Sequence, residues 1–339
     1  MKREELVNSY ENLDIEGKWE LIKRAVGQDV TEVCPLDTHE FSCFAKEQKT
    51  KAIRDRRYLK LFWHYWLRKV PLLAPAIGQR FLPLKDKEYY QYRTWYYEYL
   101  EPVIDIRNHF SDHEKVFELL ADEKSKGIYC DILMARITKS DEYYQKGYDK
   151  SKEYQQYFAL DILPLPNPEG VFVDCGGYIG DTVEKFIKYY SKKYKKIYIY
   201  EPDPQNAFQA KETLKDFHNI SIKKCGIGRK NGTAFFNSMG TSSSSIQKKG
   251  AEVKVVSLDA DIEIPITFIK MDIEGEESNG IAGAEKHIRN ERPVCAICLY
   301  HKIEDIWRLP LQVIKINSDY KLYLRHYTEN YMETVAYFI

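Results

Sequence analysis

The chain has 339 residues, 44% of them hydrophobic, which is enough for two domains with buried cores. Its 51 basic and 51 acidic residues balance, and this balance argues against a general nucleic-acid-binding protein. A charged N-terminus, the lack of any apolar run near the roughly 18 residues of a membrane span, and an odd cysteine count of 7 argue against a secreted, membrane-spanning or disulfide-bonded protein. We therefore expect a cytoplasmic location.

Residues 1–160 are predicted to form a mostly helical N-terminal domain, and residues 161–339 a second domain. Apolar residues recur at helical spacing in four segments of the first half, and prolines separate these segments. The segments are Tyr10–Val26, Lys49–Val70, Lys85–Tyr99 and His113–Lys139. We expect this domain to recognise an acceptor molecule or to join copies of the chain into a homo-oligomer.

Two aromatic clusters in the first half leave alternatives open. Leu61–Leu67 lies between basic residues and suits either an interfacial helix on an anionic membrane or a packed helix with solvated ends. The tyrosine-rich segment Tyr89–Tyr99 could stack on sugar rings, but aromatic residues at helical spacing more often pack in a core. Packing is the favoured interpretation for both segments.

The segment Val171–Thr182 carries an apolar strand, a glycine turn and a helix start in succession. The strand ends at Asp174, the turn contains Gly176, Gly177 and Gly180, and Asp181 and Thr182 can cap the helix. Such corners bind nucleotides in doubly wound α/β proteins. Because a carboxylate at the strand end would repel a pyrophosphate and hold an ammonium group, this corner favours S-adenosylmethionine over NAD.

Strands and helices alternate after this corner, which predicts a doubly wound α/β sheet of about seven strands. The expected strands after the first are Lys196–Tyr200, Ile220–Lys224, Ile266–Lys270, Val294–Tyr300, Tyr320–His326 and Thr334–Ile339. The last two are expected to close the sheet as an antiparallel hairpin. Thr233–Asn237 and Glu252–Leu258 are predicted to pair as an inserted hairpin.

Ligands of open α/β sheets bind at the carboxyl ends of the strands, so the polar residues at those ends are candidate site residues. They are Asp174, Glu201, Cys225-Gly226, Asp272 and His301. The carboxylate of Glu201 can accept both hydroxyls of a ribose. The turn lacks the G-x-G-x-x-G pattern that NAD binding favours, and the chain lacks a phosphate-binding G-x-x-x-x-G-K-[ST] loop.

Three motifs resemble the FkbM family of S-adenosylmethionine-dependent methyltransferases over roughly residues 165–339. They are Val171–Thr182, the strand end Tyr200-Glu201-Pro202, and Phe268-Ile-Lys-Met-Asp-Ile-Glu-Gly-Glu-Glu277. The resemblance implies a class I methyltransferase, Rossmann-like fold, and O-methylation of a hydroxyl on a sugar, a glycan precursor or a related natural product. The expected partners are therefore a small-molecule or glycan acceptor, and not a nucleic acid.

The family resemblance also implies roles for individual residues. Asp174 and the turn from Gly176 to Gly180 would hold the methionine part of S-adenosylmethionine, Glu201 the ribose, and Cys225-Gly226 the edge of the adenine. The expected cofactor-binding residues are Asp174, Gly176, Gly177, Tyr178, Gly180, Asp181, Thr182, Glu201, Pro202, Asp203, Cys225, Gly226 and Asp272.

His301 and Asp272 are the expected catalytic residues. Imidazole titrates near neutral pH, so His301 is the first candidate for the general base, with Asp272 as the second. His301 could instead only cap a turn. The acids of Asp272–Glu277 also suggest a hard divalent cation, but acids at a helix start are favourable without one, and we expect no metal. The competing functions are a nicotinamide-dependent oxidoreductase or epimerase, and a non-catalytic binding protein with this fold.

Overall fold

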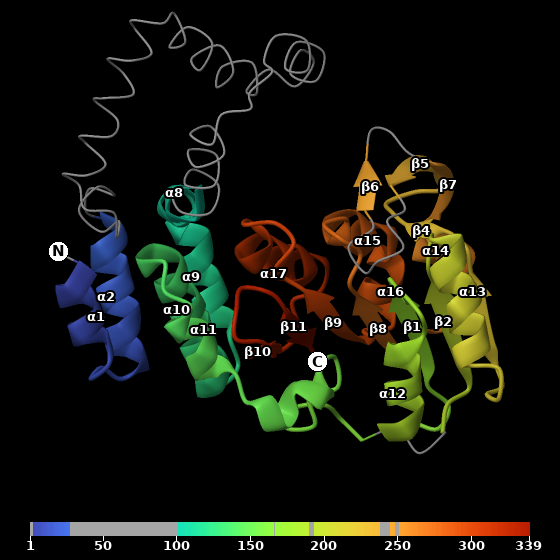
Figure 1. Ribbon diagram of the computed structural model, residues 1–339, viewed down its shortest axis with the longest axis horizontal. Coiled ribbons are helices and arrows are strands. Elements are labelled where there is room, and N and C mark those ends of the chain that lie inside the picture. Colours follow the sequence, from blue (N-terminus) through green and yellow to red (C-terminus); the bar gives the residue numbers. More distant parts are fainter. Residues whose placement is uncertain (1–2, 28–100, 166, 190–192, 238–244, 248–250) are drawn as a thin grey trace, which may run out of the picture. The chain divides into compact units, whose positions relative to one another are not determined.

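A computed structural model describes residues 3–27, 101–165, 167–189, 193–237, 245–247 and 251–339 (Figure 1). The chain divides into two compact units, Met1–Asn108 with Arg136–Ser140, and His109–Ala135 with Asp141–Ile339. The helices expected over Lys49–Val70 and Lys85–Tyr99, with both aromatic clusters, lie outside the described residues. The predicted functional boundary near residue 160 stays a prediction. Within the described residues, no helix is long and apolar enough to cross a membrane.

The first unit contains the helices α1 (Arg3–Tyr10), α2 (Ile15–Gly27) and α8 (Glu101–Asn108). The prediction of one helix over Tyr10–Val26 was wrong at its start, because the chain turns before Ile15. The side chain of Asp14 accepts a hydrogen bond from the backbone N–H of Gly17 (2.8 Å), as a helix N-cap does. Trp19 and Ile22 of α2 are buried, so the helix packs through one apolar face.

Four helical segments precede the sheet in the chain. They are α9 (Phe110–Leu119), α10 (Glu123–Thr138), α11 (Glu142–Gly147) and the short 3₁₀ helix η2 (Lys150–Gln155). The single helix predicted over His113–Lys139 is interrupted before Glu123, where the side chain of Asp122 accepts a hydrogen bond from the N–H of Ser125 (2.8 Å). Helix α9 packs against α17 (Asp305–Ile316), with the rings of His109 and Trp307 stacked at 4.4 Å between centroids.

The main sheet has seven strands in the order β10-β11-β9-β8-β1-β2-β3. The strands are β1 (Val171–Cys175), β2 (Lys196–Tyr200), β3 (Ile220–Lys223), β8 (Phe268–Met271), β9 (Val294–Cys298), β10 (Leu322–His326) and β11 (Thr334–Phe338). Strand β11 runs in the opposite direction to the other six strands of this sheet, and β10 and β11 form the closing hairpin. The predicted α/β fold, with seven strands and a C-terminal antiparallel hairpin, is confirmed.

Helices connect the parallel strands. They are α12 (Asp181–Tyr189), α13 (Pro204–Thr213), α14 (Leu258–Asp261), α15 (Glu277–Gly283), α16 (Glu285–Asn290) and α17. Helix α12 packs against α13, while α17 packs against both α15 and α16. Burial of one apolar face of each helix against the sheet explains this arrangement.

A second, four-stranded sheet has the order β4-β7-β5-β6. Its strands are β4 (Gly226–Ile227), β5 (Gly232–Asn237), β6 (Ser245–Gln247) and β7 (Ala251–Val256). The antiparallel pairing of β5 with β7 confirms the predicted inserted hairpin. Gly226, expected in a turn, instead begins the short strand β4 and pairs with Val255.

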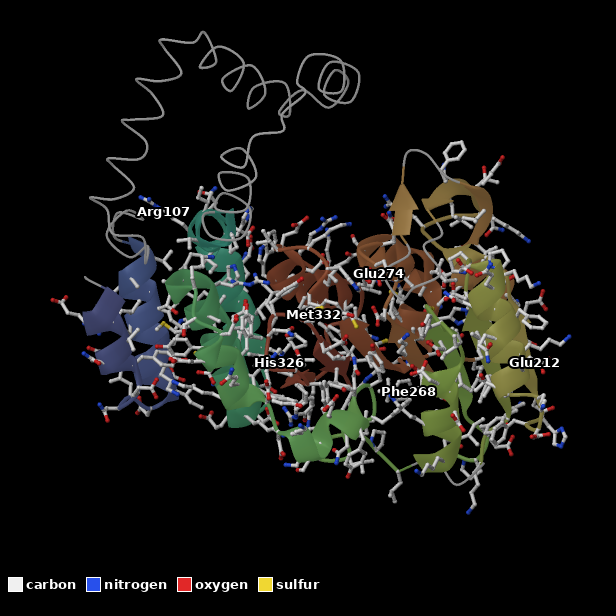
Figure 2. All side chains as sticks on the ribbon, in the orientation of Figure 1. Arg107, Glu212, Phe268, Glu274, His326 and Met332 are labelled. Carbon is white, nitrogen blue, oxygen red and sulfur yellow. The ribbon has the colours of Figure 1, made fainter. Side chains whose placement is uncertain are left out.

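Aromatic side chains fill the core on one face of the main sheet. Phe172 of β1 stacks on Phe186 of α12 at 4.3 Å between ring centroids, and it meets Phe268 of β8 edge to face at 5.4 Å. Phe268 is labelled in Figure 2. Phe158, from the segment before the sheet, completes this cluster. The segment around residue 158 therefore belongs to the core, and it carries the neighbouring Tyr157 to the strand ends.

Candidate cofactor and catalytic site

The glycine turn after β1 runs very close to the end of β8. Gly176 has a φ of +83°, and a Cβ atom there would lie 1.8 Å from the carbonyl oxygen of Asp272. Only glycine tolerates both the conformation and the contact. The N–H groups of Gly176 and Gly177 donate to the carbonyl of Tyr200 (2.9 and 3.2 Å), which ties the turn to the end of β2. The turn is therefore fixed between two neighbouring strand ends.

A buried ion pair lies beneath this turn. Nζ of Lys270 on β8 is 3.0 Å from Oδ1 of Asp174 on β1, and the two side chains are 3% and 0% exposed. Lys270 also donates a hydrogen bond to the carbonyl of Gly176 (2.6 Å). Burial raises the pKa of Asp174 to about 6, against the opposing charge of Lys270. Burial alone would lower the pKa of Lys270, but the charges of Asp174 and Asp272 raise it above its usual value.

The Asp174 carboxylate is thus already paired within the protein and has no exposed surface. The prediction that Asp174 is a free strand-end acid that holds an ammonium group does not account for Lys270. A direct contact between Asp174 and a cofactor stays a prediction. In the described structure, its charge fixes Lys270 and, through Lys270, the turn.

Glu201 directly follows β2, and the residue is 6% exposed. Its Oε2 accepts a hydrogen bond from the N–H of Tyr178 in the turn (2.9 Å), and its Oε1 accepts one from the N–H of Asp203 (2.8 Å). Burial raises the pKa of Glu201 to about 7. Each carboxylate oxygen has a further lone pair, so the group could still accept ribose hydroxyls.

The remaining cofactor candidates of the corner lie next to these groups in the chain. Asp203 caps α13, with its side chain accepting hydrogen bonds from the N–H groups of Gln205 and Asn206 (2.8 and 3.1 Å). Asp181 begins α12, where Thr182 is buried. Cys225 is buried between β3 and β4, and burial raises the pKa of its thiol.

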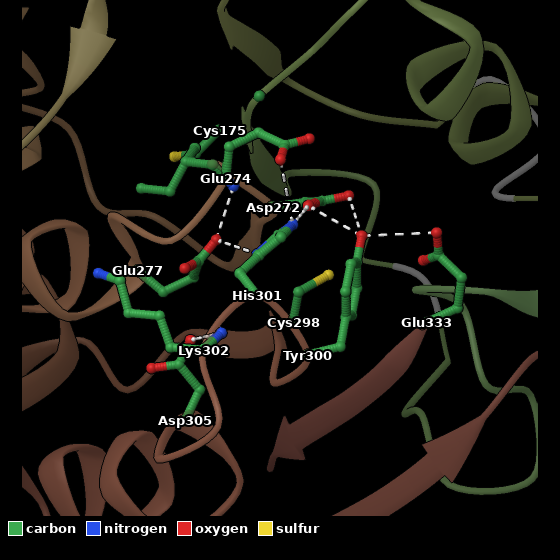
Figure 3. Close-up of polar contacts among 12 residues, drawn as sticks. Cys175, Asp272, Glu274, Glu277, Cys298, Tyr300, His301, Lys302, Asp305 and Glu333 are labelled. Carbon is green, nitrogen blue, oxygen red and sulfur yellow. Dashed lines mark hydrogen bonds and ion pairs between the residues drawn. The ribbon is translucent and has the colours of Figure 1, made fainter. Parts of the chain in front are cut away.

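Asp272 and His301, from the ends of β8 and β9, lie side by side (Figure 3). Nε2 of His301 is 3.3 Å from Oδ1 of Asp272 and 3.7 Å from Oε2 of Glu274, and its Nδ1 is 2.9 Å from Oε1 of Glu277. Burial would lower the pKa of His301, but the Glu277 carboxylate, with Asp272 and Glu274, raises it to about 9. At neutral pH the ring is therefore protonated.

Two tyrosines and a further acid complete this end of the sheet. Tyr157 donates a hydrogen bond to Oδ2 of Asp272 (2.7 Å), and the Tyr300 hydroxyl is 3.3 Å from Oδ1 of Asp272. The same Tyr300 hydroxyl is 3.4 Å from Oε1 of Glu333, in the loop between β10 and β11 (Figure 3). Burial would raise the pKa of Asp272, but Lys270 and His301 outweigh it and lower the pKa. Asp272 is therefore ionised at neutral pH.

Residues 174–326 match the family model of the methyltransferase FkbM domain. The chain contains an FkbM methyltransferase domain. This domain includes both the glycine turn and the Asp272–His301 pair. The resemblance stated from the sequence motifs is confirmed.

A solved FkbM methyltransferase from Methylobacillus flagellatus KT is 26% identical to this chain, with a TM-score of 0.62. The match covers 70% of this chain and 62% of that one, so this chain spans less than two thirds of that relative. Fibrillarin from Aeropyrum pernix, solved with natively bound S-adenosyl-L-methionine, is 10% identical with a TM-score of 0.37 and coverages of 55% and 76%. An rRNA methylase from Streptococcus thermophilus is 15% identical with a TM-score of 0.35 and coverages of 51% and 87%. Among the curated proteins, none matches the chain.

Sequence reasoning missed four residues that complete the site of the FkbM domain. Lys270 could have been found from the sequence, because a lysine in the apolar predicted strand Ile266–Lys270 requires a buried partner. Tyr157 lies in the segment before the sheet, where no strand-end pattern indicates a site residue. Tyr300 and Glu333 come from a strand end and from the hairpin loop, and no spacing rule connects them to Asp272.

Proposed function

We propose that this chain is an S-adenosylmethionine-dependent O-methyltransferase that acts on a hydroxyl of a sugar, a glycan precursor or a related natural product. One observation carries the proposal. The glycine turn, Glu201 and the Asp272–His301 pair follow β1, β2, β8 and β9, the four strands at whose carboxyl ends a ligand of such a sheet binds. The FkbM domain supports methyl transfer, and the family resemblance supports a hydroxyl acceptor.

The cofactor is proposed to lie along the turn. Backbone groups of Gly176–Gly180 would contact the methionine part, and Glu201 would accept hydrogen bonds from the ribose. Cys225 and Gly226 would border the adenine. We propose that Asp174 contributes through Lys270, because its own carboxylate has no exposed surface.

Methyl transfer is an in-line displacement at the sulfonium methyl group. The acceptor oxygen forms a bond to the methyl carbon while the carbon–sulfur bond breaks, and sulfur keeps the electron pair in S-adenosylhomocysteine. The enzyme mainly positions the oxygen about 3 Å from the methyl carbon and excludes water. The hydroxyl proton must then leave the acceptor oxygen.

Asp272 and His301 are the proposed catalytic pair for this proton. Asp272 is ionised and can accept the hydrogen bond that orients the acceptor hydroxyl. His301 is protonated while Glu277, Asp272 and Glu274 surround it, so it acts as a base only after losing that proton. The pair therefore favours Asp272 as the first contact of the hydroxyl, with His301 beside it at 3.3 Å.

A transfer assay tests this proposal. The full chain is incubated with S-adenosylmethionine and a panel of sugars and hydroxylated natural products, and release of S-adenosylhomocysteine is measured. Wild-type protein should methylate a hydroxyl, whereas Asp272→Asn and His301→Ala should each lose at least about 100-fold in rate, and His301→Ala should still bind S-adenosylhomocysteine. Methylation of amines alone would contradict O-methyl transfer. Near-normal rates in both variants would remove the pair from the mechanism.

A further inference from the structure

Three side chains from separate elements converge where β8 and β9 end (Figure 3). Asp272 follows β8, Glu277 begins α15, and His301 lies three residues beyond β9. One donor atom from each of the three lies within 4.8 Å of the others. Ligands that share a cation at about 2.0–2.2 Å are about 3 Å apart, so small side-chain rotations would bring these atoms to binding distance.

Buried donor atoms in this group lack hydrogen-bond partners. The Glu277 side chain is 0% exposed, yet its Oε2 has no partner among the described residues. The His301 side chain is 9% exposed, and its ring nitrogens form ion pairs with Asp272 (3.3 Å) and Glu277 (2.9 Å) but make no well-aligned hydrogen bond to the described residues. Buried polar atoms almost always have partners, so these atoms point to a ligand that they would share.

The charges around the group are unbalanced. Three carboxylates, of Asp272, Glu274 and Glu277, surround the ring of His301. Lys270, the nearest buried cation, is already 3.0 Å from Asp174. The neighbouring Lys302 turns its ammonium group to the carbonyl of Gly275. Carboxylates crowded in a buried site are stabilised by a cation that accepts their lone pairs.

We propose that Asp272, Glu277 and His301 bind a divalent metal ion. Two carboxylates and one imidazole suit a first-row ion such as Mn²⁺ or Zn²⁺ better than a purely oxygen-coordinated one. The acids of Asp272–Glu277 suggested a divalent cation from the sequence, although no metal was expected there. The sequence does not show which of these acids turn toward His301.

The catalytic use of this ion rests on the proposed function. A cation bound beside Asp272 would lower the pKa of an acceptor hydroxyl, and the Asp272 carboxylate oxygen that does not bind the ion would then accept the hydroxyl proton. His301 would in that case be a ligand instead of the base. Binding of the ion itself does not depend on methyl transfer and can be measured without an acceptor.

The test uses Mn²⁺ alone with the full chain. Protein stripped with a chelator is titrated with Mn²⁺, and bound ion is measured by calorimetry and by the loss of the free-ion electron paramagnetic resonance signal. Wild-type protein should bind one equivalent. Asp272→Asn and Glu277→Gln should each weaken binding at least 10–100-fold. Glu276→Gln is the matched control, because Glu276 lies beside Glu277 but bonds to Asn279, and it should bind as wild type.

Circular dichroism checks that each variant is folded. If Glu277→Gln does not fold, the affinity of Asp272→Asn for Mn²⁺ tests the proposal. Absence of Mn²⁺ binding in folded wild-type protein, or unchanged binding in both ligand variants, would overturn the proposal. Loss of binding in Glu333→Gln but not in Glu277→Gln would also overturn it, since the ion would then lie on the other side of Asp272. Titration of the same stripped protein with S-adenosylhomocysteine separates the two proposals. Cofactor binding without Mn²⁺ binding would contradict only the proposed metal site. Mn²⁺ binding without cofactor binding would contradict only the proposed methyltransferase function.

Discussion

Lys270 and Asp174 form an ion pair of 3.0 Å between neighbouring strands, and both side chains are almost completely buried. The pair lies directly under the turn that is proposed to hold the cofactor, since Lys270 also donates a hydrogen bond to the carbonyl of Gly176. Burying two charges costs more than an exposed pair does, unless each charge keeps its partner. The pair therefore couples the stability of the sheet to the shape of the turn.

Replacing Lys270 with methionine should destabilise the protein by about 3–5 kcal/mol, because Asp174 is left buried without a cation. The double variant Asp174→Asn with Lys270→Met should recover most of this loss, as no unpaired charge remains. Lys185→Met is the control, since Lys185 and Asp181 form an exposed pair at 3.8 Å worth less than about 1 kcal/mol. Urea unfolding measures all three. Equal effects of Lys270→Met and Lys185→Met would refute the structural importance of the buried pair.

Gly176→Ala should cost at least about 3 kcal/mol of folding free energy, because the φ of +83° and the approach to the Asp272 carbonyl both exclude a side chain. The matched control is Gly127→Ala in α10, where an added Cβ meets nothing within 4 Å. Alanine there should stabilise the helix by about 0.5–1 kcal/mol. Thermal unfolding of the two variants should thus shift in opposite directions, and a tolerated Gly176→Ala would contradict the described turn.

Buried His326 should make stability depend on pH. Burial lowers its pKa to about 4, while its Nδ1 is 2.9 Å from Oγ1 of Thr334. The unfolded chain takes up the proton near pH 6.5 and the folded chain only near pH 4. The folded state therefore loses stability as pH falls through this window, by up to about 3 kcal/mol.

The experiment compares free energies of unfolding of wild-type protein and His326→Asn between pH 7 and pH 4. As the pH falls, the free energy of unfolding of the wild type should decrease more than that of His326→Asn. Glu201 and Glu333, whose raised pKa values act in the opposite direction, are the same in both proteins and cancel. Exposed His218→Asn is the control and should follow the wild type. A difference that stays constant with pH would show that His326 titrates normally.

Glu201→Gln should weaken binding of S-adenosylhomocysteine about 10–100-fold, because hydrogen bonds from ribose to a charged acceptor contribute about 1.5–3 kcal/mol. Glutamine would also lose one of the two backbone hydrogen bonds that Glu201 accepts, because its N–H₂ group would face the N–H of Tyr178 or of Asp203. Glu212→Gln, on the exposed side of α13 (Figure 2), is the matched control. Unchanged affinity in folded Glu201→Gln would exclude a ribose contact at this strand end.

Much of the sheet could be predicted, because local sequence patterns indicate the order of its strands and helices. The apolar strands, the glycine turn and the polar strand ends each occupy a few consecutive residues, and parallel strands bring their carboxyl ends to one edge. Helix ends were harder to predict. Asp14 and Asp122 interrupt segments whose apolar periodicity continues, and periodicity alone does not detect a capping side chain.

Contacts between distant residues account for what could not be predicted at the site. Asp174 was predicted to be a free acid, but Lys270 lies 3.0 Å away and forms an ion pair with it. Tyr157 and Glu333 reach the Asp272 region from the segment before the sheet and from a hairpin loop, and no local pattern connects them. The pKa of His301 likewise depends on Glu277. The motif contains Glu277, but the sequence does not show that its side chain points toward His301.

Calorimetric titration of the full chain with S-adenosylhomocysteine and, separately, with NAD tests the central claim most directly. The glycine turn, with a buried acid beneath it and Glu201 beside it, predicts saturable binding of S-adenosylhomocysteine with one molecule per chain and no binding of NAD. Binding of NAD without binding of S-adenosylhomocysteine would contradict the assignment of this site to a methyltransferase.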